Sequence, residues 1–345
     1  MNTTSPSRHS PWPHRLAMAL ALTTFPVIWV GGLVTTYEAG MAVPDWPNTY
    51  GYNLLLYPWQ TWLFGPWDLF VEHGHRLLAS TAGLLTIALV ISIWRCEQRR
   101  GLRWLAVAAL AGVCLQGALG GMRVLLDERV LARLHGCLGP AFFALTVAIA
   151  LLTSRNWQRG ADRQVDASAG KVQRLALLTT ALAYLQLVIG AHLRHPSTDW
   201  APSVFQTIVV FHLAVAAAIA AHAGLLAARA WRWPAIWHGS LCLAALVALQ
   251  LALGTLTWLE NYGWPAGAET YQVAAGHTVA AQSQMQTLVT TAHVATGALI
   301  VAVALVVTMQ SFHELRQSVV AGAGAPRQVA RGAARQLAVA GRMLA

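Results

Sequence analysis

The sequence predicts an all-α integral membrane protein whose eight transmembrane helices form two pseudo-symmetric four-helix bundles. Composition is the first reason: 56% of the 345 residues are hydrophobic and only 10% are charged, whereas about 25% are charged in ordinary soluble domains. The second is the length of the apolar runs, since crossing about 30 Å of hydrocarbon takes about 20 helical residues. The third is a pattern of glutamine, glycine and histidine residues that recurs along those runs.

Eight apolar runs have the required length. They are rich in Ala and Leu and lack the alternation of apolar and polar residues that is typical of an outer-membrane barrel. The first run is expected to remain as a helix, because no small-residue cleavage site closes it. We expect helices near residues 16–35, 71–93, 103–122, 131–152, 174–193, 204–228, 236–258 and 286–310.

The basic residues predict the orientation in the membrane. Eighteen of the 23 Lys and Arg residues fall on one side of the predicted topology. Because basic residues are retained in the cytoplasm during insertion, both termini are expected there. The external loops at about 36–70 and 259–285 contain no Lys or Arg. The net charge of +10 therefore reflects topology and contact with anionic lipid of the bilayer, and it argues against a nucleic-acid partner.

Two motifs alternate along the chain. Gln-x-x-x-Gly occurs near the outer ends of the third, fifth and seventh spans, and one histidine lies at a similar depth in each even-numbered span. The glutamines are Gln116, Gln186 and Gln250, and the histidines are His75, His135, His212 and His293. This repeat predicts a first bundle at 16–152, a cytoplasmic linker at 153–173, a second bundle at 174–310 and a cytoplasmic tail at 311–345.

The four histidines are candidate metal ligands. An ionisable side chain inside a span is costly, so four at one depth favour a function over scattered structural contacts, which are the alternative. Buried imidazoles suit heme iron, zinc or copper. Zinc or copper needs three or four converging ligands, whereas two histidines per bundle match one heme with two axial imidazoles. All four lie on the outer side, so the two sites are expected side by side.

The stretch "VEHGHRLLAS" adds an acid and a cation to the first bundle. Glu72 lies three residues before His75 and shares its helix face, while His73 points nearly opposite. Arg76, four residues after Glu72, is placed to pair with that carboxylate or with a heme propionate. The structural alternative is a buried Glu–Arg pair that fixes the helix. As a reactive group, Glu72 is placed to move protons beside a carbon that is being oxidised.

Three segments resemble the heme A synthase family. "EHGHR" at 72–76 is similar to its Glu-x-x-His-Arg motif, "QGALGG" at 116–121 to its third-span motif, and "GMAVPDWPNTYG" at 40–51 to its first external loop. The resemblance extends over about 16–310. It implies a membrane enzyme that oxidises the C8 methyl group of heme O to the formyl group of heme A, with water as oxygen source and heme B as resident cofactor. The cysteine pair that many bacterial relatives have in this loop is missing here.

An asymmetry between the two bundles predicts a division of labour. Three residues before His212 stands Val209, and Leu213 follows it, so the second bundle lacks counterparts of Glu72 and Arg76. A resident heme needs axial ligands and an apolar surrounding, whereas a substrate needs a reactive group nearby. We therefore expect heme B at His212 and His293. Heme O is expected at a site made by His75, His135, Glu72 and Arg76, where Glu72 is catalytic and the two histidines are axial ligands of the iron.

Two other functions are compatible with parts of this pattern. A di-heme electron-transfer cytochrome of the b type needs no Glu72, and a proton-coupled transporter relays protons through its histidines and binds no heme. For the synthase, the expected partners are heme O, heme O synthase and the lipid bilayer, with an electron acceptor that the sequence does not name and with homo-oligomerisation left open. We favour a prokaryotic cell membrane over the mitochondrial inner membrane as its location.

Overall fold

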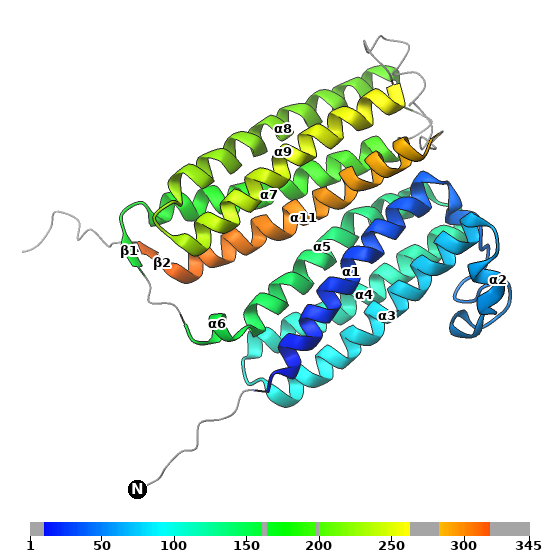
Figure 1. The fold of residues 1–345 in the computed structure, drawn as a ribbon, viewed down its shortest axis with the longest axis horizontal. Helices are drawn as coiled ribbons and strands as arrows, with labels where there is room; N and C mark the ends of the chain where they lie inside the picture. The colour runs from blue at the N-terminus through cyan, green and yellow to red at the C-terminus, as the bar shows by residue number, and fades with distance from the viewer. Residues whose placement is uncertain (1–9, 161–163, 197–199, 263–282, 318–345) are drawn as a thin grey trace, which may run out of the picture.

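A computed structural model of the chain describes residues 10–160, 164–196, 200–262 and 283–317 (Figure 1). Within these residues, eight helices are long and apolar enough to cross a membrane, and each contains one predicted span. The prediction of an all-α, multi-pass membrane protein is confirmed. The eight helices are α1 Trp12–Thr36, α3 Trp67–Cys96, α4 Arg100–Leu126, α5 Arg129–Thr153, α7 Ala169–Arg194, α8 Pro202–Arg229, α9 Pro234–Tyr262 and α11 Gln284–Glu314.

The helices extend beyond the apolar runs because local signals, rather than hydrophobicity, set their ends. Pro202 and Pro234 open α8 and α9, where the fixed φ of proline suits the first turn and its missing N–H costs nothing. Pro66 is the N-cap residue of α3 and lies just outside its first turn. Asp127 ends α4 with a φ of 50°, a left-handed conformation that Asp tolerates better than most residues, and α5 begins two residues later.

The helices pack as two groups of four. In the first bundle, α1 and α4 each contact both α3 and α5; in the second, α7 and α9 each contact both α8 and α11. The bundles meet where α11 lies against α1 and α5, and where α5 reaches α7 (Figure 1). Most of the segment between α9 and α11, at 263–282, and both chain ends lie outside the described residues.

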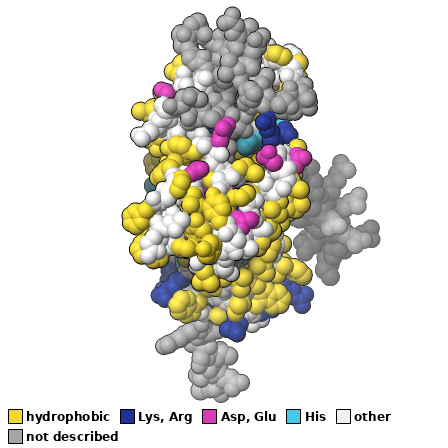
Figure 2. Space-filling model, turned by 90° about the vertical axis from the view of Figure 1, so that its right-hand side faces the viewer, with side chains coloured by type: hydrophobic (Ala, Val, Ile, Leu, Met, Phe, Trp, Pro, Cys, Tyr) yellow, Lys and Arg dark blue, Asp and Glu magenta, His cyan; other side chains and the backbone are white. Residues whose placement is uncertain are grey.

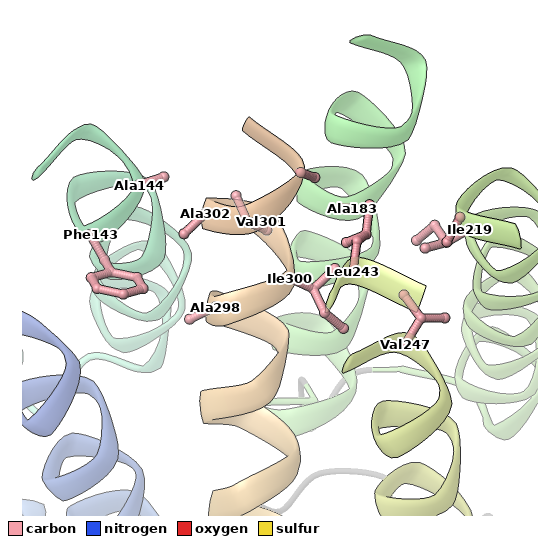
Figure 3. Packing of buried hydrophobic residues seen from close by; sticks show 12 residues of the cluster. Phe143, Ala144, Ala183, Ile219, Leu243, Val247, Ala298, Ile300, Val301 and Ala302 are labelled. Atoms are coloured by element: carbon pink, nitrogen blue, oxygen red, sulfur yellow. The ribbon is translucent and has the colours of Figure 1, made fainter. Parts of the chain in front are cut away.

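Small side chains allow close packing where the bundles meet. Figure 3 shows Phe143 and Ala144 of α5 facing Ala298 and Ala302 of α11. On its other side α11 packs against the rest of the second bundle through residues such as Ile300. Small residues at such contacts let helix backbones approach closely, and this favours association inside a bilayer.

Short elements close the two ends of the molecule. At one end, here the strand end, α6 Arg155–Gln158 precedes β1 Gln164–Asp166, which pairs in parallel with β2 Leu315–Gln317. Residues 311–317, assigned to the tail from their sequence, thus continue α11 and form β2. Ser311 is fully buried and Leu315 nearly so. This burial explains why the packed segment of α11 and β2 extends beyond the end of the apolar run.

The opposite end, here the α2 end, carries the loop between α1 and α3, which the sequence predicts to be external. This loop contains the 3-10 turns η1 Ala39–Met41 and η2 Leu54–Leu56 and the helix α2 Trp59–Leu63. Figure 2 shows a broad hydrophobic surface on the face that it views, with most Lys and Arg side chains gathered at the lower edge. Five basic residues belong instead to the α2 end: Arg76, Arg123, Arg129, Arg133 and Arg194.

Candidate functional site

The first histidine site lies inside the first bundle and consists of His75 and His135. His75 extends from α3 and His135 from α5, and their ring centroids are 6.4 Å apart with the ring planes nearly perpendicular, at 81°. The side chain of each residue is partly buried. Two residues that are 60 positions apart in the sequence thus face each other across the bundle, as the repeat predicted for a pair.

The second histidine site repeats this geometry in the second bundle. His212 of α8 and His293 of α11 also have ring centroids 6.4 Å apart, with an interplanar angle of 57°. Both residues are partly buried. Each bundle therefore holds one facing pair of imidazoles, and the chain pairs the histidines in sequence order.

Each of the four imidazoles packs against a glycine on the preceding transmembrane helix. Adding a Cβ atom to any of these glycines would bring it within 2.9 to 3.3 Å of the Cε1 atom of the histidine, closer than side chains normally pack. The four glycine–histidine contacts are Gly31 with His75, Gly120 with His135, Gly190 with His212 and Gly254 with His293. The glycine of each Gln-x-x-x-Gly motif, together with Gly31 of α1, therefore makes room for one imidazole ring.

The glutamines of the same motifs reach the same histidine-bearing helices. The side-chain Nε2 of Gln186 donates to the carbonyl oxygen of His212 at 2.9 Å, and Nε2 of Gln250 lies 3.3 Å from Nε2 of His293. The backbone carbonyl of Gln116 lies 3.2 Å from Nδ1 of His135. That contact favours the tautomer with a proton on Nδ1, which leaves the Nε2 lone pair free to bind a metal.

Both sites fit a heme iron between two imidazoles. A metal–imidazole bond is about 2 Å long and the ring centre lies about 1 Å behind the bound nitrogen, so two axial imidazoles place their centres about 6 Å apart. Both observed separations are 6.4 Å. The described residues contain no group of three or more His, Cys, Asp or Glu side chains placed to hold a metal ion. A zinc or copper site therefore finds no ligand set within this part of the chain.

The protein leaves much of the hydrogen-bonding capacity of these imidazoles unused. Nδ1 of His75, His212 and His293 is buried and makes no hydrogen bond within the described residues. A buried polar atom without a partner costs about 1–3 kcal/mol, and an iron bound at Nε2 would leave these Nδ1 atoms unpaired. The observation that favours a bound heme at both pairs is therefore the 6.4 Å separation of their rings.

Glu72 and Arg76 form a buried pair that fastens the loop between α1 and α3. Nη2 of Arg76 donates to Oε1 of Glu72 at 2.6 Å, and Oε2 of Glu72 accepts the backbone N–H of Val43 at 2.8 Å. Arg76 also donates to the carbonyl oxygens of Val43, Asp45 and Asn48. All four of its terminal N–H donors are thus used, so Arg76 is occupied by the loop rather than free for a propionate.

The loop is further fixed to α3 and α4. His73 points away from the first site, as predicted, and its Nδ1 lies 3.0 Å from Oγ1 of Thr49. The ring of Trp46 packs directly on Gly121, where no side chain would fit. Burial alone would raise the pKa of Asp45, but hydrogen bonds from the backbone N–H groups of Gly51 and Tyr50 hold it below its ordinary value.

Sequence reasoning missed Arg123, a partly buried cation near the first site. Arg123 lies three residues after Gly120 on α4, so it shares the helix face on which His135 packs. Its guanidinium group touches the backbone of Gly40, where an added Cβ would lie 2.7 Å from both terminal nitrogens. The signal was present in the sequence, because Arg123 is one of the few basic residues on the side that should lack them.

Comparison with known proteins identifies the family. Residues 66–198 match the family model described as cytochrome oxidase assembly protein. A heme A synthase of Symbiobacterium thermophilum is 30% identical over 266 residues, which cover 68% of this chain and 82% of that protein. The chain belongs to the heme A synthase family. The heme A synthase of Geobacillus kaustophilus is 28% identical over 266 residues, or 70% of this chain and 80% of that protein.

A further heme A synthase, from Shouchella clausii, is 26% identical over 195 residues, which cover 55% of this chain and 62% of that protein. Within the heme A synthase family, the family model covers the first histidine site, Glu72 and Arg76, and it ends before the second site begins. The resemblance seen in the motif "EHGHR" is therefore confirmed at the level of the family.

Proposed function

We propose that this protein is a heme A synthase, a membrane oxidoreductase that converts the C8 methyl group of heme O into the formyl group of heme A with oxygen taken from water. The observation that carries the proposal is the pair of facing imidazoles in each bundle, with ring centroids 6.4 Å apart, in a chain of this family. Two successive two-electron oxidations of the methyl carbon, through an alcohol and a hydrated aldehyde, yield the formyl group and release protons and electrons.

The first site binds the substrate. His75 and His135 hold the iron of heme O. Glu72 supplies the acid–base group, because it lies one helical turn from His75 and only 2% of it is exposed. Arg76 and the N–H of Val43 keep this carboxylate in place. Through these contacts the acid is linked to the external loop, which offers a route for protons away from the oxidised carbon.

The second site holds the resident cofactor. His212 and His293 would hold heme B, which would supply a path for electrons leaving the substrate. Val209 and Leu213 stand where the first bundle has Glu72 and Arg76, so this site has no acid–base group of its own. The acceptor that finally takes the electrons is a separate molecule, and heme O synthase is the expected donor of the substrate.

The α2 end faces away from the cytoplasm, and both termini lie inside. Support comes from the basic residues of the strand end, among them Arg99, Arg103, Arg155 and Lys171, since cytoplasmic ends of membrane helices carry the excess of Lys and Arg. The relatives named above are bacterial, which supports the bacterial cell membrane as the location. Both histidine sites then lie in the outer half of the membrane.

The activity is tested by analysing hemes from cells that express the protein together with a source of heme O. Pyridine-hemochrome spectra and mass analysis of the extracted hemes are expected to show heme A, and cells without this protein are expected to keep heme O. An electron-transfer cytochrome would bind two hemes and leave heme O unchanged. A transporter would purify without a Soret band. Either result would exclude the synthase.

The glycine–histidine contacts predict the effect of adding a single methyl group by a glycine-to-alanine substitution. Gly254→Ala places a Cβ 3.0 Å from Cε1 of His293, so the imidazole has to move and the heme B content of purified protein is expected to fall severalfold. Gly120→Ala is expected to weaken heme O binding in the same way, since its Cβ lies 3.2 Å from Cε1 of His135. Soret absorbance per mole of protein measures both effects.

Two other helical glycines provide matched controls. A Cβ on Gly224 of α8 or Gly117 of α4 meets nothing within 4 Å. Replacing a helical glycine with alanine usually stabilises the helix by about 0.5–1 kcal/mol, so these variants are expected to keep their heme and unfold at a slightly higher temperature. Equal heme loss in Gly224→Ala and Gly254→Ala would show that the histidine contact is not the cause.

A further inference from the structure

The charges near the first site do not balance. Arg76, Arg123 and Glu72 lie within electrostatic reach of one another. Glu72 is already bound by Arg76 at 2.6 Å and by the N–H of Val43. Within the described residues, no carboxylate pairs with Arg123 and its guanidinium makes no hydrogen bond. Two arginines thus share the single carboxylate of Glu72. A partly buried cation without a counter-charge of its own is costly, which favours a further negative charge beside Arg123.

The position of Arg123 defines where that charge would lie. The residue follows Gly120 by one turn of α4, and Gly120 packs on the ring of His135. Electrostatic influence of Arg123 reaches both His75 and His135. Gly40 of η1 covers the guanidinium from the loop side. The cation therefore lies between the imidazole pair and the external loop, at the α2 end of the first site.

We propose that Arg123 binds a carboxylate group of the tetrapyrrole held between His75 and His135. The planar fork of a guanidinium group matches a carboxylate with two parallel hydrogen bonds, and a porphyrin with propionate groups provides such carboxylates at its edge. This contact orients the substrate, so that one edge of the ring faces the loop and the opposite edge faces the interior of the bundle. The inference rests on the proposed function for the identity of the ligand.

The neighbouring arginines are less suited to this role. The four terminal N–H donors of Arg76 are used by Glu72 and by three loop carbonyl oxygens. Arg194 donates to Oγ1 of Thr36 at 2.5 Å, in a contact between α7 and α1. Arg133 is partly buried at the start of α5, and it lies two residues before His135, so it points to nearly the opposite face of that helix. It therefore serves as the matched control.

The test compares a porphyrin that has free carboxylates with one in which they are blocked. Iron protoporphyrin IX and its dimethyl ester are titrated separately into purified full-length protein that retains its resident heme. Binding is followed by the change in Soret absorbance, and the signal that remains in His75→Ala is subtracted so that only the first site is measured. Wild-type protein is expected to bind the free acid about tenfold or more tightly than the ester, as a charge-assisted hydrogen bond requires.

Arg123→Gln is expected to reduce this preference about tenfold while the affinity for the ester stays as in wild type. Arg133→Gln should keep the wild-type preference. Gly40→Ala keeps the charge but pushes on the guanidinium, so an intermediate preference is expected.

Three results would overturn the proposal: no preference in wild type, an unchanged preference in Arg123→Gln, or an equal loss of acid and ester binding in that variant. The proposed oxidation is judged separately by heme A formation. An Arg123-dependent preference in a protein that makes no heme A would support the carboxylate contact and reject the synthase activity.

Discussion

Replacing His212 or His293 with alanine is expected to remove the heme B spectrum from purified protein. Each residue supplies half of the imidazole pair in the second bundle, where the ring centroids are 6.4 Å apart. Loss of one axial ligand leaves the iron with an open position and lowers heme affinity, we expect by more than about tenfold, since even partners of metal ligands contribute 10- to 100-fold. The Soret absorbance of detergent-purified protein measures the result.

The corresponding variants in the first bundle serve as the comparison. His75→Ala and His135→Ala are expected to keep most of the heme B spectrum and to abolish heme A formation, because the two sites lie in different bundles. The opposite pattern, with heme B lost from the first-bundle variants and retained by the second, would exchange the roles of the two sites. Loss of heme B in all four variants would instead indicate that the bundles do not bind heme independently.

Glu72→Gln is expected to abolish heme A formation while the protein still binds heme O. Glutamine keeps the shape of the side chain and a carbonyl oxygen that can accept the N–H of Val43, but it cannot take up a proton. Removing a general acid–base group lowers turnover by about 100-fold or more. The measurement is the ratio of heme A to heme O in extracts of cells that express the variant.

The amount of bound heme O distinguishes a catalytic role of Glu72 from a role in anchoring the loop. If Glu72 only fastens the loop through Arg76 and Val43, the loss of its charge should weaken heme O binding and turnover together. Glu72→Asp keeps the acid on a shorter side chain, so it is expected to retain part of the turnover that Glu72→Gln loses. Normal heme A formation by Glu72→Gln would assign this residue to the structural pair.

The membrane spans and the histidine pairs could be predicted from the sequence because each rests on a local signal. About 20 apolar residues suffice to identify a span, and one histidine at a fixed depth in each even-numbered span marks the candidates. Helical periodicity also separated Glu72 from His73, and the structure places His73 against Thr49 of the loop. These are properties of single helices, and they need no knowledge of how the helices are arranged.

The features that the sequence left open depend on contacts between distant segments. Gly120 meets His135 because α4 packs on α5, and no pattern in either helix alone fixes that register. The hydrogen bonds of Arg76 to the loop depend on how that loop folds, and its residues have no regular hydrophobic periodicity from which the fold could be predicted. Pairing of β1 with β2 joins segments 151 residues apart, as in Gln164 with Leu315. Arg123 was missed because it stands in an apolar helix, although it is one of the few basic residues on the side of the membrane that is predicted to lack them.

The most direct test of heme binding by the two histidine pairs is to determine the axial ligands of the iron in purified protein that carries both hemes. Near-infrared magnetic circular dichroism and electron paramagnetic resonance distinguish low-spin iron with two imidazole ligands from high-spin iron and from iron with a sulfur ligand. The geometry of the two histidine sites predicts two low-spin bis-imidazole hemes per chain, one lost in His293→Ala and the other in His135→Ala. High-spin iron, or one heme whose signal depends on histidines of both bundles, would contradict it.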